Sequence, residues 1–224
     1  MIIGKFVIIA LLGYLLGAIP FGVLISRRAA KVDIRQYGSG RMGATNVLRI
    51  AGKKAAALAA ALDVVKGVLA VVFGGLIMGD GAIIIGQITL GGLSAQSMAA
   101  FAAVVGHVWP VFVKFRGGRG VATFMGGLLT LYLPAALFGG VVMLVAAGIT
   151  RYASLGSIAG LAGTFFILVP LTIIYGLPLE YIVYTFAGAV LIIIMHRDNI
   201  NRLMAGNERK IGGKIKKENL PTVD

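Results

Sequence analysis

The sequence predicts an all-α integral membrane protein with seven transmembrane helices, and this prediction rests on composition, apolar runs and charge placement. Of the 224 residues, 58% are hydrophobic and 13% are charged, whereas an ordinary soluble domain has about 25% charged residues. Several apolar runs reach the roughly 20 residues that a helix needs to cross a bilayer. We therefore exclude a water-soluble globular fold and expect residues 1–224 to form a single polytopic domain with a basic C-terminal tail.

Five spans are plain in the sequence, and a sixth apolar stretch is ambiguous. The plain spans cover residues 2–26, 55–78, 90–113, 154–175 and 177–195. The stretch 121–150 has 30 residues, which is too long for one ordinary crossing and short for two. Pro134 lies near its middle, where a proline interrupts helical hydrogen bonding.

The placement of Lys and Arg resolves the ambiguous stretch. Segments 27–54, 114–119 and 197–217 hold 18 of the 21 basic residues, and such residues concentrate in cytoplasmic loops. The chain must then cross the membrane an even number of times between the second segment and the tail. We therefore predict two short helices, the fourth and fifth, that break near Leu133 and Pro134, with the N-terminus outside and the C-terminus in the cytoplasm.

The chain carries a formal charge of +13, which by itself fits nucleic acid, anionic lipid or an anionic substrate. Cysteine is absent and there are two histidines, so thiol chemistry, thiolate metal sites and an all-imidazole zinc site are excluded. The function must therefore be built from the polar segments at the expected cytoplasmic ends of the helices.

The first polar segment, residues 38–49, combines glycines with hydroxyl groups and arginine. Small residues let backbone amides turn toward an anion, and hydroxyl and guanidinium groups add donors. Its glycine spacing also matches a dinucleotide fingerprint, but that motif requires a preceding strand, and the flanks here are transmembrane helices. The candidates for phosphate contact are Ser39, Gly40, Gly43, Thr45, Asn46 and Arg49.

The second polar segment, residues 106–123, contains a basic glycine-rich turn directly before a helix. Such a turn joins backbone amides, arginine side chains and the positive end of a helix dipole, and this combination binds phosphate. Arg119 directly precedes the helix, which favours it over Arg116 for phosphate contact. The candidates are Arg116, Gly117, Gly118, Arg119, Gly120 and Thr123.

The third segment, residues 195–208, follows the last span. If that span continues as a helix, His196, Asn199 and Arg202 recur at three-residue spacing and share one face. Within the second span, charges are costly unless they pair or face a polar cavity, and Asp63 and Lys66 have the spacing to pair. The residues expected to line the site are His107, Asp63, Lys66 and Arg202.

These three segments resemble the motifs of one family, the bacterial membrane acyltransferases that move a fatty acyl group from acyl phosphate to glycerol 3-phosphate. The first resembles Gly-Ser-Gly-Asn-x-Gly-Ala-Thr-Asn, with Arg41 in place of asparagine. The second resembles Gly-His-x-x-Pro followed by Phe-Lys-Gly-Gly-Lys-Gly-Val-Ala-Thr, with Arg116 and Arg119 in place of both lysines. The third resembles Arg-His-x-x-Asn-Ile-x-Arg-Leu, with Met195 in place of arginine. The resemblance covers essentially the whole chain.

The resemblance implies a multi-pass protein of the bacterial cell membrane with its active site at the cytoplasmic side. It implies formation of 1-acyl-glycerol 3-phosphate with release of inorganic phosphate, an early step of phospholipid synthesis. The implied partners are glycerol 3-phosphate, acyl phosphate and membrane lipid, with no metal or other cofactor. Nucleic acid is then not needed to explain the positive charge, and the sequence specifies no oligomeric state.

For the mechanism, we expect direct attack of the sn-1 hydroxyl on the acyl carbonyl. The catalytic candidates are His196, Ser39, Arg49 and Asn199. His196 is the side-chain base nearest to neutrality by its ordinary pKa, but a substrate phosphate oxygen is an alternative proton acceptor. Two further alternatives are an acyl-enzyme on Ser39, which needs an adjacent base, and a transporter or channel for phosphorylated solutes.

Overall fold

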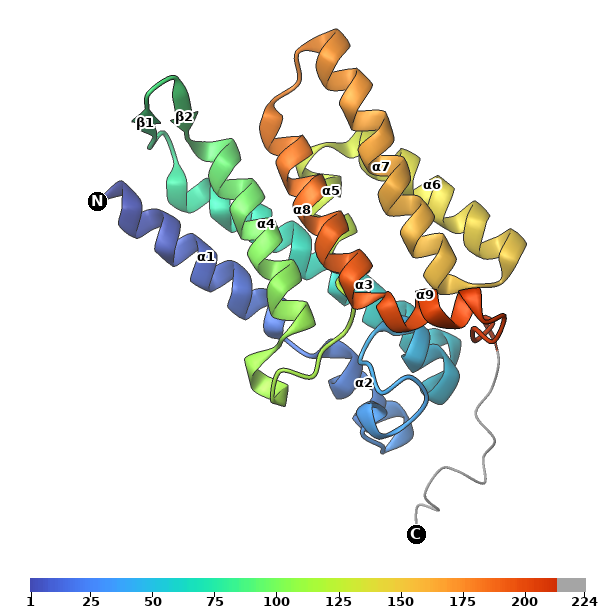
Figure 1. Cartoon of the computed structure of the whole chain (residues 1–224). Helices are drawn as coiled ribbons and strands as arrows, with labels where there is room; N and C mark the ends of the chain where they lie inside the picture. The colour runs from blue at the N-terminus through green and yellow to red at the C-terminus, as the bar shows by residue number, and fades with distance from the viewer. Residues whose placement is uncertain (213–224) are drawn as a thin grey trace.

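The computed structural model describes residues 1–212, and helices make up most of it (Figure 1). The helices are α1 Ile2–Ala18, α2 Phe21–Ala30, α3 Ala44–Met78, α4 Gly92–Val108, α5 Val121–Leu131, α6 Leu133–Thr150, α7 Ala153–Tyr175, α8 Leu179–Met195 and α9 Arg197–Met204. Two 3₁₀ turns, η1 Ile34–Gln36 and η2 Val111–Val113, lie in the loops. The strands β1 Ile83–Ile85 and β2 Ile88–Leu90 pair antiparallel as a small hairpin. The tail residues Lys214, Lys216 and Lys217 lie outside the described residues.

Within residues 1–212, five helical segments have the length and apolarity to cross a membrane, or six if α8 and α9, bent by 60°, form one span. The ambiguous stretch divides at Tyr132, between α5 and α6, close to the predicted break. The division is uneven, because α5 has 11 residues whereas α6 has 18 and is long enough to span. The total of seven crossings and their orientation stay predictions.

The second predicted span is longer in the structure than expected. Helix α3 begins at Ala44 and includes a kink at Gly52, which has φ 84°, a conformation that side chains other than glycine rarely adopt. The segment before the kink carries the end of the first polar motif, including Asn46 and Arg49. Gly52 is not helical and divides α3 into two helical segments, so the first segment can turn away from the second.

Small residues allow the central helices to approach closely. A Cβ on Gly13 or Gly17 of α1 would collide with the backbone of Ala99 or Ala103 in α4. This is the packing expected in a membrane, where tight van der Waals contact replaces much of the hydrophobic driving force. The aromatic rings of Phe124 and Tyr184 stack with their centroids 5.0 Å apart and join α5 to α8.

The two ends of the helix bundle differ in character. Figure 1 shows the β1–β2 hairpin at one end, and α2, α9 and the long polar loops at the other. Helices α6 and α7 form a hairpin on one side of α8, and α1 and α4 lie on its other side. All three polar motifs therefore gather at the same end of the molecule.

Candidate active site

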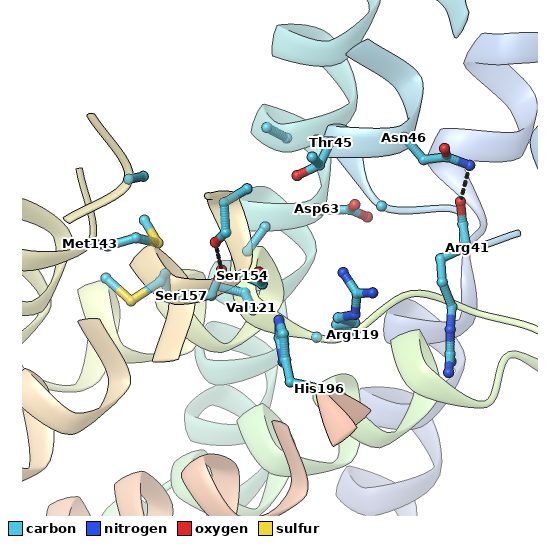
Figure 2. Close-up of a pocket in the computed structure, with 18 of the residues that line it drawn as sticks. Arg41, Thr45, Asn46, Asp63, Arg119, Val121, Met143, Ser154, Ser157 and His196 are labelled. Carbon is cyan, nitrogen blue, oxygen red and sulfur yellow. Dashed lines mark hydrogen bonds between the residues drawn. The ribbon is translucent and has the colours of Figure 1, made fainter. Parts of the chain in front are cut away.

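A cavity of about 360 Å³ lies where the three polar motifs meet. Figure 2 shows the carboxylate of Asp63, the guanidinium of Arg119 and the ring of His196 pointing into the same space. The predicted residues that line it are Ser39, Gly43, Thr45, Asn46, Arg49, Asp63, His107, Arg119, Gly120 and His196. A small adjoining pocket extends the site to Asn199 and Arg202.

Three helix N-termini open onto this cavity. Its wall includes the first residues of α3, α5 and α7 together with the glycines that precede α3 and α5. A helix N-terminus presents unpaired N–H groups and a partial positive charge, and therefore attracts anions. The N-terminus of α7, with Ala153 and Ser154, is a part of the site that the sequence reading did not identify.

Arginine side chains reinforce this positive field. The Nε atom of Arg119 is buried and has no hydrogen-bond partner among the described residues. Burial, together with the charges of Arg41, Arg202 and Arg49, lowers the pKa of Arg119 to about 10, so the side chain is still charged at neutral pH. A buried charged donor atom without a partner is costly, and an anionic ligand would supply the missing acceptor.

Asn46 organises the first loop. Its Nδ2 donates to the carbonyl oxygens of Ile34, Tyr37 and Arg41 at 3.2, 3.1 and 2.9 Å. Its Oδ1 accepts from the backbone N–H of Ser39 at 3.1 Å. These bonds engage both polar atoms with the loop itself, so Asn46 supports the site as a scaffold where the sequence suggested phosphate contact.

The other candidates of the first motif differ in whether they line the cavity. Ser39, Gly43, Thr45 and Arg49 line the cavity. Gly40 adopts a positive φ of 67° and is exposed, outside the cavity lining. Gly40 therefore shapes the loop through its backbone conformation.

The second motif divides between the cavity and its surroundings. Arg119 and Gly120 line the cavity, whereas Arg116 is exposed and absent from its lining. Thr123 is fully buried in α5 and also lies outside the lining. Arg116 and Thr123 thus lie outside the lining to which Arg119 belongs, and their predicted contact with phosphate stays a prediction.

Gly117 and Gly118 serve a packing role in that motif. A Cβ on Gly117 would collide with the carbonyl oxygens of His107 and Val108, and one on Gly118 would collide with Nε2 of His107. The N–H of Gly118 donates to the carbonyl oxygen of His107 at 3.1 Å. These glycines let the turn sit directly on the end of α4 and bring Arg119 to the cavity.

His196 occupies the bend between α8 and α9. Its Nδ1 lies 2.8 Å from the carbonyl oxygen of Ile192, a contact in which Nδ1 carries the proton and Nε2 is left as an acceptor. Burial and the nearby positive charges of Arg119 and Arg41 lower its pKa to about 4. His196 is therefore neutral at physiological pH.

Glu208 is a site residue that the sequence reading left without a role. Its side chain is 4% exposed and its Oε2 accepts from Nε of Arg202 at 2.8 Å. Its Oε1 accepts from Asn199 at 2.6 Å and from Ser154 at 3.0 Å. Despite burial, these hydrogen bonds hold the pKa of Glu208 below its usual value. Only the fold reveals this position, because the motif spacing ends at Arg202.

The third motif does not continue the last span as one straight helix, because α9 bends by 60° from α8. Its three residues still converge on the same region. His196 lies at the bend, and Asn199 and Arg202 turn toward Glu208. The bend thus closes the end of the cavity with polar side chains.

One wall of the cavity is apolar. Val121 and Met125 from α5 contribute to it, as do Met143, Leu144 and Ala147 from α6. A hydrocarbon chain placed here would lie between helices and meet the cationic cluster at its polar end. The cavity thus combines the two environments that a lipid phosphate or an acylated anion requires.

Asp63 and Lys66 form the pair that their spacing predicted. Asp63 Oδ1 lies 2.9 Å from Lys66 Nζ, and both side chains are 2% exposed. Asp63 lines the cavity as predicted, whereas Lys66, also expected to line the site, lies outside the lining. His107 joins the pair, with Nδ1 3.4 Å from Asp63 Oδ1.

Fold and cavity together define a helical membrane protein with a cationic site beside an apolar wall, and comparison with known proteins specifies the family. The family model described as glycerol-3-phosphate acyltransferase matches residues 7–206. Glycerol-3-phosphate acyltransferase 3 of Dehalococcoides mccartyi is 58% identical over 214 residues, covering 96% of this chain and 99% of that protein. The chain therefore belongs to the glycerol-3-phosphate acyltransferase family.

Two solved structures share the fold. The crystal structure of PlsY (YgiH), an integral membrane glycerol 3-phosphate acyltransferase, in its glycerol 3-phosphate form has a TM-score of 0.79 and 35% identity. It covers 92% of this chain and 96% of that chain. The lysophosphatidic acid form has a TM-score of 0.77 and 34% identity, covering 92% and 95% of the two chains.

Proposed function

We propose that the protein transfers a fatty acyl group from acyl phosphate to the sn-1 hydroxyl of glycerol 3-phosphate, giving lysophosphatidate and inorganic phosphate. The observation that carries this proposal is the buried, unpartnered Nε atom of Arg119 in a cavity that has three helix N-termini and an apolar wall. Phosphate groups fit the cationic end, and an acyl chain fits the side formed by Met125 and Met143. Both structural neighbours are described with ligands of this chemistry, glycerol 3-phosphate and lysophosphatidic acid.

Charge balance supports a donor that carries its own phosphate. The pKa of Arg119 responds to Arg41, Arg49 and Arg202, and Glu208 is the carboxylate that opposes them. Four arginines and one carboxylate leave three net positive charges. One phosphate dianion neutralises only part of this excess, whereas glycerol 3-phosphate and acyl phosphate, as two dianions, together more than offset it.

In the proposed reaction, the glycerol 3-phosphate hydroxyl oxygen forms a bond to the acyl carbonyl carbon. The bond from that carbon to the phosphate oxygen breaks, and phosphate leaves. The proton of the hydroxyl passes to the departing phosphate, so that hydrogen phosphate is released. The arginines and helix N-termini hold both phosphates and offset negative charge as the transition state forms.

His196 positions the hydroxyl in this scheme. Its Nε2 is an acceptor, and the contact of Nδ1 with Ile192 fixes the ring. With a pKa near 4, the imidazole is too weak a base to hold the proton at neutral pH, since effective general bases have a pKa near the working pH. A phosphate oxygen is the better proton acceptor.

The rival scheme, an acyl-enzyme on Ser39, lacks support in the described residues. The N–H of Ser39 donates to Asn46 at 3.1 Å, but no described hydrogen bond joins the Ser39 hydroxyl to a base. Incubation of the enzyme with labelled acyl phosphate in the absence of glycerol 3-phosphate, followed by quenching, tests this point. A covalently labelled Ser39 peptide would overturn the direct attack.

The activity is tested with the purified full-length protein in detergent or vesicles. Glycerol 3-phosphate and palmitoyl phosphate are expected to yield lysophosphatidate and phosphate, while palmitoyl-coenzyme A at the same concentration yields no product. Product formation from the thioester alone would reject acyl phosphate as donor. Failure of both donors would reject the acyltransferase reaction itself.

We also propose that the protein lies in the bacterial plasma membrane with this site at the cytoplasmic side. The support is the location of the motifs at one end of the molecule (Figure 1), combined with the basic residues in the same segments. A cytoplasmic reporter fused to the C-terminus is expected to be active. A signal only from a periplasmic reporter would reject this orientation.

A further inference from the structure

A buried charged cluster lies at the cavity wall and has no part in the chemistry proposed above: Asp63 and His107 line the cavity, and Lys66 lies outside its lining. Lys66 Nζ is 2.9 Å from Asp63 Oδ1, and His107 Nδ1 is 3.4 Å from the same oxygen. All three side chains are 2–3% exposed. The charges of Asp63 and Lys66 cancel, so the pair adds no net positive charge to the cavity.

One end of the cluster supports the turn that carries Arg119. The ring of His107 lies against Gly118, where a Cβ would collide with Nε2, and the His107 carbonyl oxygen accepts from the Gly118 N–H. Gly118 directly precedes Arg119. Rotation of the His107 ring would therefore displace the backbone that places the Arg119 guanidinium.

The other end supports the first loop. Lys66 Nζ donates to the carbonyl oxygen of Ile19 at 3.2 Å and lies 5.8 Å from the ring centre of Phe21. These residues mark the break between α1 and α2. One residue later, Gly22 of α2 packs so tightly against the carbonyl oxygen of Met42 that a Cβ would collide with it. Met42 precedes Gly43, the residue before α3 and a part of the cavity wall.

A buried ion pair is a poor stabiliser, because desolvation of the charges offsets most of their attraction. Neutral residues of similar size would stabilise the bundle equally well. The position of this pair, between the supports of two anion-binding loops, indicates a different role. On one side, Asp63 Oδ1 faces His107 Nδ1 at 3.4 Å. On the other side, the hydrogen bond from Lys66 to the Ile19 carbonyl oxygen fixes the segment before α2.

We propose that Asp63 and Lys66 are positioning residues that hold the Ser39 loop and the Arg119 turn in register, acting through the Ile19 carbonyl and through His107. The inference rests on the proposed phosphate-binding function of the cavity. Neither residue needs to touch the reacting atoms. Their loss is expected to weaken substrate phosphate binding more than it slows the chemical step.

Two variants test the contacts of the cluster. Asp63→Asn with Lys66→Met removes both charges and the bond to Ile19 while keeping side-chain size. His107→Phe keeps a flat ring against Gly118 but removes the nitrogen that faces Asp63. For each, we expect the KM for glycerol 3-phosphate to rise about tenfold, as loss of a well-placed phosphate contact does, while kcat changes less than about threefold.

A matched control separates positioning from general stability. Tyr184→Phe removes a fully buried hydrogen bond to the carbonyl oxygen of Phe124, outside the cavity lining. It is expected to lower the thermal midpoint followed by circular dichroism and to leave KM unchanged. The Asp63/Lys66 double variant is expected to keep its thermal midpoint and to have a raised KM.

Coupling to Arg119 provides a second readout. Interacting residues give non-additive effects, so the KM penalty of His107→Phe should shrink in an Arg119→Lys background, because a flexible ammonium depends less on exact turn geometry than a planar fork does. Binding of glycerol 3-phosphate, measured by titration calorimetry without donor, tests the loops even if acyl phosphate is not the donor. Absence of wild-type turnover would therefore count against the proposed function and not against the positioning role.

A wild-type KM and Kd in the folded double variant would overturn the proposal, as would additive effects of His107→Phe and Arg119→Lys. If the double variant does not fold, His107→Phe decides the question alone, and wild-type binding in that variant would reject the role. An equal rise of KM in Tyr184→Phe would also reject it, because the effect would then be general.

Discussion

The exposed segment that ends at Arg116 and the buried turn 117–120 are adjacent in the chain, yet they face different surroundings. Phe112, Phe115 and Arg116 are exposed, and Arg116 takes no part in the cavity lining. Three residues later, the Arg119 Nε is buried without a described partner. The difference arises because Gly117 and Gly118 pack against His107 without side chains of their own. The presence of an arginine in the motif is therefore not enough to place it in the site. The close packing of Gly117 and Gly118 brings Arg119 to the cavity and leaves Arg116 outside it.

The largest expected effect contrasts these two arginines. Arg119→Ala removes charge-assisted hydrogen bonds to a phosphate in a buried site, each worth about 1.5–3 kcal/mol, and should lower kcat/KM about a hundredfold or more. Arg116→Ala should change it less than about threefold, because exposed charges are screened. Initial rates with glycerol 3-phosphate and palmitoyl phosphate measure both. Equal losses in the two variants would show that the contrast of environments has no functional meaning.

The second effect concerns the scaffold of the opposite loop. Asn46→Asp replaces a donor to three carbonyl oxygens with a carboxylate that repels them, and we expect about a tenfold to hundredfold loss of kcat/KM. Asn46→Ala should cost less, because it removes the bonds without adding repulsion. The order of the two variants is the test. If Asn46→Asp were as active as wild type, the loop would not depend on this side chain.

A smaller effect is expected at Glu208, which joins α9 to the start of α7. Glu208→Gln keeps the size of the side chain but weakens the charge-assisted bonds from Arg202 and Asn199. We expect KM for glycerol 3-phosphate to change about threefold to tenfold through misplacement of these donors. Ser94→Ala removes a polar contact to Glu180 near the hairpin end and serves as control with unchanged KM. A Glu208→Gln enzyme that matches this control would exclude Glu208 from the site.

The main helices could be predicted from the sequence, but some breaks within and between them could not. Apolar runs identify the main helices, and Pro134 with the charge pattern locates the break now found at Tyr132. The kink at Gly52 and the bend at His196 were not predictable, because each depends on packing around a single backbone position. Sequence patterns indicate the local conformation that a segment favours, whereas the kink and the bend depend on tertiary packing.

The site shows the same limit. Motif spacing finds Ser39 and Arg119 because phosphate binding requires donors of those types, and it finds His196 because an imidazole is a candidate base. It does not show that Asn46, although it lines the cavity with Thr45, uses its side-chain hydrogen bonds to hold the first loop. Ser154 lies outside the three polar segments and Glu208 is the last residue of the third, and only the approach of the chain after α9 to the start of α7 brings them together. Long-range contacts of this kind leave no local signature.

The smallest expected effect on activity is the pH response of His196, which again depends on its buried surroundings. Because its folded pKa is lowered to about 4 from an ordinary value of 6.5, the native state stays unprotonated there while the unfolded state binds a proton between these values. The free energy of unfolding should therefore fall as pH drops from about 6.5 to 4. The rate should show no inflection from this residue between pH 6 and 8, and His196→Asn should flatten the acid-side loss of thermal midpoint. An inflection near pH 6.5 that disappears in His196→Asn would instead make His196 the base, and would contradict transfer of the proton to phosphate.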